Sequence, residues 1–181
     1  GGFCGPPKED ENELLYQIRR FHSFIWASGG VYSDYYIHQI DELSWMKDAW
    51  PVSAHALGGR HYRGNNVDQN FDTYSVEYTF ADGTKAFCGF RRINKTRTDF
   101  ATYVHGTKCA AQFSGNIHAP DGVIYKDQRI SKDNIAWKPP REKVNPWQAE
   151  WNVLLDAIRN DKPHNEAKRA ALSNLGAIMG R

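Results

Sequence analysis

The sequence is short of several features that would place it quickly in a functional class. Its 181 residues carry 23 Lys and Arg against 21 Asp and Glu, a net charge of +2 with no basic tract. This balance argues against a nucleic-acid-binding surface. No apolar run approaches the roughly 20 residues of a membrane span. The three cysteines form no Cys-x-x-Cys pair and have no histidine at ligand spacing. We therefore expect no nucleic acid, membrane or metal as partner.

Motifs for nucleotide binding and for self-contained catalysis are missing as well. Neither "GGFCG" nor "GGRHYRG" has the Gly-x-Gly-x-x-Gly spacing between a strand and a helix, and no P-loop is present. We therefore expect no cofactor on this chain alone. There is also no nucleophile elbow. No signal peptide is visible at the start, although a cut fragment would have lost one, so the compartment stays open with the cytoplasm slightly favoured.

What is present fits one globular domain. Hydrophobic residues make up 40% and charged residues 24% of the chain, which is ordinary for such proteins. Residues 1–12 are rich in Gly, Pro and charge, and we interpret them as a flexible lead-in. Residues 13–181 are then a single domain.

Helices are predicted near both ends of that domain. Apolar residues follow helical spacing from Glu13 onward. A second helix is expected from an N-cap at Ser33 to about Lys47. The end of the chain predicts two more helices, of which the first is capped by Asn145 and has Pro146 at its first position.

Between these helices the apolar period changes to two. The segment "YSVEYTFADGTKAFCGF" predicts a β-hairpin with its turn at Asp82-Gly83. A second hairpin and two short strands are expected after it. Helices, then antiparallel strands, then helices predict an α+β fold, with an open, predominantly antiparallel sheet and helices packed on one face. The other face must be solvated, paired with another subunit or used as a binding floor.

The best candidate for chemistry lies in "GGVYSDYYIHQIDELSWM". Asp34, His38 and Asp41 stand at i, i+4 and i+7, so they share one helix face. A carboxylate against one imidazole nitrogen fixes the tautomer and leaves the other nitrogen free to accept a proton. The same residues also fit an exposed polar stripe with an acid at the helix start. Arg60 and His61 follow a strand at a double glycine, where loops often carry ligands, and simple turn structure is the alternative there.

Several segments together resemble the C-terminal domain of the glucose–fructose oxidoreductase/inositol dehydrogenase (Gfo/Idh/MocA) family. The pattern is a Gly-Gly loop followed by Asp-x-x-x-His-x-x-Asp, here "GGVYSDYYIHQID". Further landmarks follow in the same order as "WPVSAHALGGR", "NFDTYSVEYTFADGTKAFCGFRR", "VHGTKCAAQFSG" and the helical end from "NPWQAEWNVLL" onward. The resemblance covers about Glu13 to Arg181.

The resemblance implies a division of labour within a longer enzyme. A Rossmann domain binds NAD or NADP, while the C-terminal domain contacts a sugar or polyol substrate and forms homo-oligomers through its open sheet. Carried over, His38 is the catalytic acid/base and Asp34 is its partner. The expected substrate contacts are Tyr36, where the family often has a small residue, together with Arg60 and His61.

Two departures limit what this chain is expected to do by itself. The Gly-rich nucleotide-binding half and the family's Glu-Lys-Pro segment are absent from the sequence. We therefore interpret the chain as the substrate-binding and oligomerisation domain of an NAD(P)-dependent oxidoreductase, inactive without its N-terminal Rossmann domain. It would be either a trimmed piece or a naturally short gene product. A non-catalytic carbohydrate-binding or dimerisation module is the alternative.

Overall fold

The computed structural model describes residues 4–116, 121–140 and 144–181. These residues fall into two compact units. One unit holds the chain up to Thr98 together with Ala171–Arg181, and the other holds Asp99–Ala170. The single domain expected over residues 13–181 stays a prediction.

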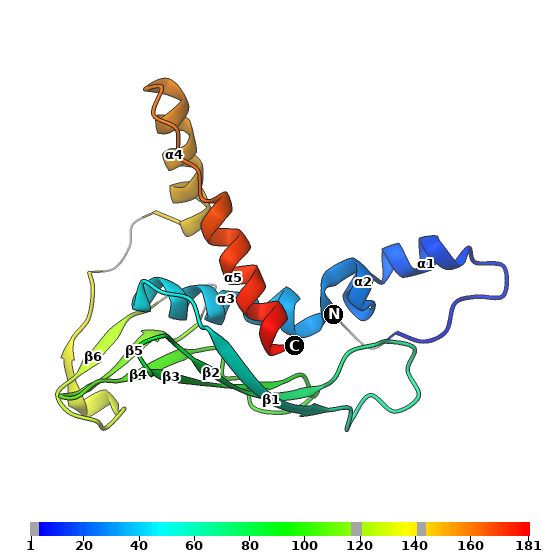
Figure 1. Cartoon of the computed structure of the whole chain (residues 1–181), viewed down its shortest axis with the longest axis horizontal. Coiled ribbons are helices and arrows are strands. Elements are labelled where there is room, and N and C mark those ends of the chain that lie inside the picture. Colours follow the sequence, from blue (N-terminus) through cyan, green and yellow to red (C-terminus); the bar gives the residue numbers. More distant parts are fainter. Residues whose placement is uncertain (1–3, 117–120, 141–143) are drawn as a thin grey trace. The chain divides into compact units, whose positions relative to one another are not determined.

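The first unit begins with helical segments. Their bounds are α1 Glu13–Arg19, the 3₁₀ turn η1 Phe21–Ser23, α2 Ile25–Ser28 and α3 Gly30–Lys47 (Figure 1). Asn12 caps α1, since its side-chain oxygen accepts a hydrogen bond from the Leu15 N–H at 3.1 Å. The helix expected from Glu13 is confirmed, but it stops at Arg19.

Helix α3 begins earlier than predicted, so the assignment of Ser33 as its N-cap is wrong. Gly29 occupies that position with φ +73°, in the left-handed region that glycine adopts without a Cβ clash. Gly29 also ends α2, because its N–H donates to the carbonyl of Ile25 at 2.8 Å. One glycine therefore joins two helices directly, and Ser33 lies buried in the first turn of α3.

A three-stranded antiparallel sheet follows. Its strands are β1 Ser53–Gly59, β2 Thr73–Thr79 and β3 Lys85–Arg91, in the order β1-β2-β3. The predicted hairpin between β2 and β3 is confirmed. Its turn is closed by the Asp82 carboxylate, which accepts from the Thr84 N–H at 3.0 Å, and by Gly83 at φ +84°.

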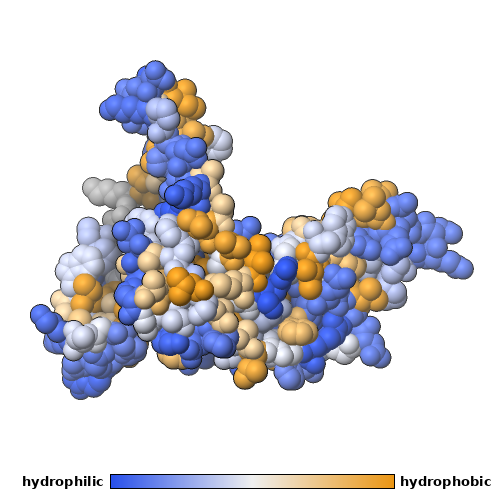
Figure 2. Space-filling model, in the orientation of Figure 1, coloured by the Kyte–Doolittle hydropathy of each residue, from blue (hydrophilic) through white to orange (hydrophobic). Residues whose placement is uncertain are grey.

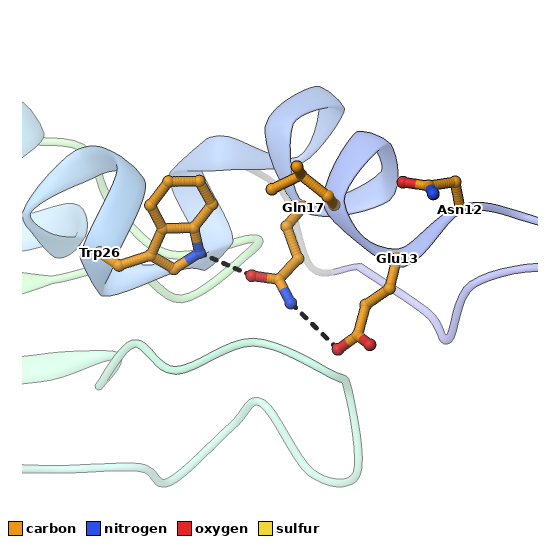
Figure 3. Close-up of a pocket in the computed structure, with 5 residues that line it drawn as sticks. Asn12, Glu13, Gln17 and Trp26 are labelled. Carbon is orange, nitrogen blue, oxygen red and sulfur yellow. Dashed lines mark hydrogen bonds between the residues drawn. The ribbon is translucent and has the colours of Figure 1, made fainter.

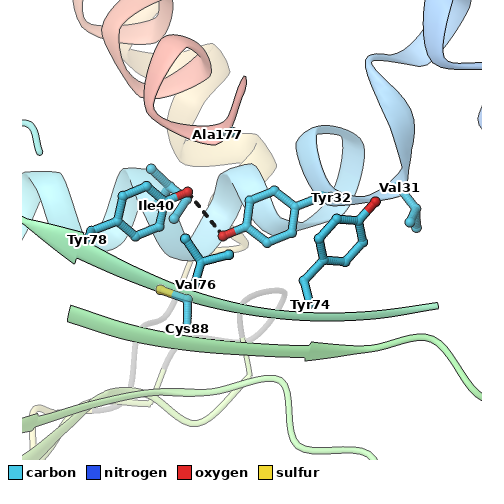
Figure 4. Packing of buried hydrophobic residues seen from close by; sticks show 8 residues of the cluster. All are labelled: Val31, Tyr32, Ile40, Tyr74, Val76, Tyr78, Cys88 and Ala177. Atoms are coloured by element: carbon cyan, nitrogen blue, oxygen red, sulfur yellow. Dashed lines mark hydrogen bonds between the residues drawn. The ribbon is translucent and has the colours of Figure 1, made fainter. Parts of the chain in front are cut away.

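The core of this unit lies between the sheet and helix α3. Strand alternation places Tyr74, Val76 and Tyr78 on one buried face. The full cluster is Val31, Tyr32, Ile40, Tyr74, Val76, Tyr78, Cys88 and Ala177 (Figure 4). The Tyr78 hydroxyl donates to the carbonyl of Gly176 and lies 3.0 Å from the Tyr32 hydroxyl. This pair ties α3, β2 and helix α5, which spans Ala167–Gly180, to one another.

The other face of the same sheet is open. Leu57 on β1 and Phe87 on β3 are 80% and 77% exposed on it. Apolar side chains are also exposed along α1 and α2, and Figure 2 shows them gathered over these two helices. Within the described residues of the first unit, the helices that pack on this sheet lie on its buried face, as predicted.

The second unit contains a four-stranded antiparallel sheet. Its strands run in the order β4 Thr102–His105, β5 Ala110–Ser114, β6 Val123–Tyr125 and β7 Ile135–Trp137. A short 3₁₀ turn, η2 Lys132–Asn134, leads into β7, and helix α4 spans Pro146–Arg159. The predicted cap is confirmed, because the Asn145 side chain accepts from the Trp147 N–H at 2.9 Å.

The predicted α+β class is confirmed. The strands of the described ranges form two open antiparallel sheets rather than the one sheet that the sequence suggested. Among the helices of the described ranges, none combines the length and the apolar character that crossing a bilayer requires.

Candidate active site

The polar stripe predicted on α3 is present, but its members have different surroundings. Asp34 and His38 lie four residues apart on an unbroken helix, so both project from one face. The Asp34 side chain is partly buried, at 23% exposure, whereas His38 is exposed. Asp41 is half-buried, and its carboxylate accepts from the Ser173 hydroxyl on α5 at 2.7 Å. Asp41 thus anchors α3 to α5.

The Asp34 carboxylate is hydrogen-bonded to a histidine for which the sequence predicted no role. His22 Nδ1 lies 2.5 Å from Asp34 Oδ2. Because a carboxylate only accepts hydrogen bonds, His22 donates through Nδ1. In the neutral ring, Nε2 is then the nitrogen that can accept. No hydrogen bond joins Asp34 to His38 within the described residues. The catalytic roles assigned to Asp34 and His38 stay predictions.

Several contacts hold His22 in place. Its carbonyl accepts from the Asn70 side-chain amide at 2.7 Å, and the same amide's oxygen accepts from the Val31 N–H at 2.6 Å. Asn70 thereby links η1 to the start of α3. The imidazole ring lies 3.9 Å from the Phe21 ring and 5.8 Å from the Tyr35 ring, measured between centroids.

No sequence signal pairs residue 22 with residue 34. The two positions lie in separate helical segments, and only the turns through η1 and α2 bring them together. A spacing rule for one continuous helix cannot find such a pair. The nearest available signal was a histidine shortly before the double glycine.

Tyr36 lies on the sheet side of α3. Its ring stacks on Tyr32 at a centroid distance of 5.1 Å and meets Phe90 edge-on at 5.6 Å. Its hydroxyl donates to the Gly89 carbonyl at 3.1 Å, and burial raises the pKa of the phenol. The predicted substrate contact of Tyr36 stays a prediction, since the polar atom already has a protein partner.

Arg60 and His61 begin the loop between β1 and β2. The Arg60 guanidinium donates to the carbonyls of Gly64, Asn66 and Asp68. These bonds fold the loop back on itself, so the observed task of Arg60 is to shape it. The His61 ring is exposed. The substrate contacts assigned to both residues stay predictions.

A buried carboxylate fixes the same loop from the inside. Asp72 is completely buried and accepts from the backbone N–H groups of His61, Tyr62 and Arg63, at 2.6 to 3.1 Å. Burial alone would raise the pKa of this carboxyl, but the three N–H donors outweigh it and the pKa is lowered. Nearby, the buried Arg63 donates to Asp68 at 2.9 Å. The loop is therefore a built structure rather than a loose connection.

A shallow pocket lies elsewhere, between α1 and α2. It is lined by Asn12, Glu13, Leu14, Gln17 and Trp26 (Figure 3). The Trp26 indole N–H donates to Gln17 at 2.6 Å, and the Gln17 amide donates to Glu13 at 3.2 Å. None of the residues predicted for the site lines this pocket.

The described residues offer little to a metal or a dinucleotide. Within them, no group of three or more His, Cys, Asp or Glu side chains is arranged to hold a metal ion. A dinucleotide needs a Gly-rich turn between a strand and a helix. The double glycine ahead of α3 follows a helix instead, so this segment of the described chain does not form that turn.

Comparison with known proteins shows which family the chain matches. Residues 10–112 match the GFO/IDH/MocA C-terminal domain. No curated protein matches the sequence.

Among solved structures, the chain is similar to UDP-N-acetylglucosamine 3-dehydrogenase from Acidithiobacillus ferrooxidans, with TM-score 0.60 and 20% identity over 80% of this chain and 44% of that one. It is also similar to aldose-aldose oxidoreductase from Caulobacter crescentus, with TM-score 0.61 and 15% identity over 78% of this chain and 41% of that one. A super-repressor mutant of Gal80p from Saccharomyces cerevisiae gives TM-score 0.64 and 17% identity over 99% of this chain and 52% of that one. At these identities the likeness shows a shared fold. The chain spans about half the length of these proteins or less.

Proposed function

Because the chain belongs to the GFO/IDH/MocA C-terminal domain family, we propose that it is the substrate-binding domain of a nicotinamide-dependent oxidoreductase. The family match covers more than half of the sequence, over residues 10–112. The substrate class we propose is a sugar or polyol. Two of the similar structures support this choice, since their names give an aldose and a nucleotide sugar as substrates.

The observation that carries the proposal is the polar face at the start of α3. Asp34 and His38 occupy the Asp and His positions of the family motif and share one helix face. The ring of His38 is exposed, so a ligand or a further domain can reach it. On this proposal an imidazole on this face takes the proton from a substrate hydroxyl, or returns it to a carbonyl.

The cofactor belongs to another part of the parent enzyme. NAD or NADP bound to a Rossmann domain would supply the hydride acceptor or donor. Tyr36, Arg60 and His61 remain the proposed substrate contacts. The His61 ring is exposed, whereas a substrate would reach the polar atoms of Tyr36 and Arg60 only by exchanging their present hydrogen bonds.

We also propose that the domain forms a homo-oligomer through the open face of the three-stranded sheet. Leu57 and Phe87 expose most of their apolar surface there. Covering such side chains contributes about 25 cal/mol for each Å² of apolar surface removed from water. A second copy of the same sheet face would cover them symmetrically.

The test is an assay on the natural protein that contains this chain. NAD and NADP are each offered with a panel of aldoses, polyols and UDP-linked sugars, and formation of the reduced nicotinamide is followed. The substitution H38Q should lower kcat by about two to four decades, the usual contribution of a general acid/base. The matched control is H105Q, on an exposed histidine at the end of β4 in the other unit, which should keep wild-type turnover.

A specific observation also supports the non-catalytic alternative. The carboxylate that should serve His38 is hydrogen-bonded to His22 instead. Sugar binding without turnover by either nicotinamide would support that alternative and overturn the enzymatic proposal.

A further inference from the structure

The pairing of Asp34 with His22 suggests a second proton-transfer residue at the proposed site. We infer that the imidazole which Asp34 orients is His22, and that Nε2 of His22 exchanges the proton with the substrate hydroxyl. This inference rests on the proposed oxidoreductase function. It adds a residue outside the family motif to the proton chemistry proposed for His38.

The geometry of the pair determines which nitrogen of the His22 ring holds the proton. His22 Nδ1 and Asp34 Oδ2 are 2.5 Å apart, so the neutral ring holds its proton on Nδ1 and has a lone pair on Nε2. A carboxylate in this position fixes the tautomer and stabilises the imidazolium that forms when Nε2 takes a proton. Within the described residues, Nε2 of His22 has no hydrogen-bond partner.

The surroundings of the pair leave it accessible and hold the His22 ring in place. The His22 side chain is 36% exposed and that of Asp34 is 23% exposed, so the pair lies at the surface, open to a ligand, without being fully solvated. The ring packs against the Phe21 and Tyr35 rings, and the backbone carbonyl of His22 accepts from Asn70. An imidazole fixed in this way has lost much of the motion that weakens an exposed histidine as a base.

The proton balance of the step is simple. When a substrate alcohol is oxidised, its O–H bond breaks and an N–H bond forms at Nε2 of His22. The positive charge that results lies beside the Asp34 carboxylate. In the reducing direction the same proton returns to the carbonyl oxygen. The parent enzyme's nicotinamide supplies the hydride acceptor or donor.

The first test needs no turnover. The natural protein is labelled with ¹⁵N-histidine and studied by long-range ¹H–¹⁵N NMR at a pH high enough for its histidines to be neutral. The signals of the His22 ring are identified because they are missing from the spectrum of H22N. We expect the Nδ1–H tautomer in the wild type and its loss in D34A. A wild-type ring protonated on Nε2, or a spectrum unchanged in D34A, would overturn the pairing.

The second test uses turnover, with the substrate that the panel identifies. Asparagine at position 22 can still donate to Asp34 near the place of Nδ1, but it has no basic Nε2. We expect H22N to lower kcat by about two to four decades with little change in KM. The double variant H22N/D34A should have a kcat no lower than that of H22N alone. The fold-losses in kcat of D34A and H38Q should instead multiply in their double variant. Circular dichroism of each variant confirms that it folds.

The outcomes separate the two proposals. Wild-type kcat in H22N would overturn the catalytic role of His22 while leaving the oxidoreductase function intact. If the effects of D34A and H22N on kcat multiply, while a double variant of D34A and H38Q is no slower than H38Q alone, the role returns to His38. A wild-type protein that turns over no sugar or polyol overturns the proposed function and this catalytic role together, and the NMR spectrum still decides the pairing.

Discussion

Replacing Asp72 should be among the most damaging single changes in the first unit. Its carboxylate is completely buried and accepts from three backbone N–H groups that begin the β1–β2 loop. In D72A these donors lose their acceptor. A buried unsatisfied donor costs about 1–3 kcal/mol.

The three donors will not cost equally. His61 and Tyr62 are exposed residues whose N–H groups water can reach once the loop loosens, whereas Arg63 is buried. Counting the Arg63 donor in full and the other two at a reduced value gives a loss of about 3 kcal/mol in the free energy of unfolding. D72N keeps one oxygen acceptor but loses the charge, so its loss should be roughly 1–2 kcal/mol.

The effect of pH has a definite sign. The pKa of Asp72 is lowered in the folded protein, so its stabilisation is fully present above the unfolded value of about 3.9. It is lost as the pH falls from there through the lower folded value. The difference in unfolding free energy between wild type and D72N should therefore be constant near neutral pH and shrink below about pH 4.

Urea unfolding followed by circular dichroism measures both effects. The control is D10A, at an exposed turn position, which should leave the unfolding midpoint nearly unchanged. A midpoint for D72A equal to that of the control would refute the reasoning, because it would mean that the three backbone donors find other partners at no cost.

Two further predictions concern packing. A Cβ on Gly180 would overlap the Tyr78 hydroxyl, so G180A should lower the unfolding free energy of the first unit by about 1–3 kcal/mol. The control is G5A, whose Cβ meets nothing within 4 Å and which should not destabilise it. Equal urea midpoints for the two variants would contradict the observed docking of α5. If the open sheet face joins two copies, F87E should shift sedimentation toward a smaller species and Y62E, on the exposed loop, should not. A wild type that sediments as a monomer would remove the proposed interface.

The sheet could be predicted because its signals are local. The alternation of Tyr74, Val76 and Tyr78 and the turn at Asp82-Gly83 set the hairpin and its buried face. The cap of α4 was likewise readable, since Asn145 lies immediately before its helix. Each of these features depends on neighbours in sequence.

The start of α3 could not be placed in the same way. A serine followed by an acid is a common N-cap signal, but the left-handed Gly29 allows α3 to begin directly after α2. Helix boundaries of this kind depend on the backbone path of the preceding segment. The prediction therefore failed by one turn at the helix start.

The candidate site was only partly predictable, for a related reason. Spacing correctly put Asp34 and His38 on one face, but the partner of Asp34 comes from residue 22, across two turns. Likewise, the bonds that hold Arg60 come from carbonyls along its own loop, which composition cannot show. Contacts between separate segments need the folded backbone.

The central claim, that the start of α3 is a proton-transfer site, is tested most directly by kcat of D34N in the natural protein, with saturating nicotinamide and substrate. The matched control is D41N on the same helix, which keeps an oxygen acceptor for Ser173. We expect D34N to lower kcat by about two decades or more and D41N to retain wild-type turnover. Equal kcat values for D34N and the wild type would contradict the claim.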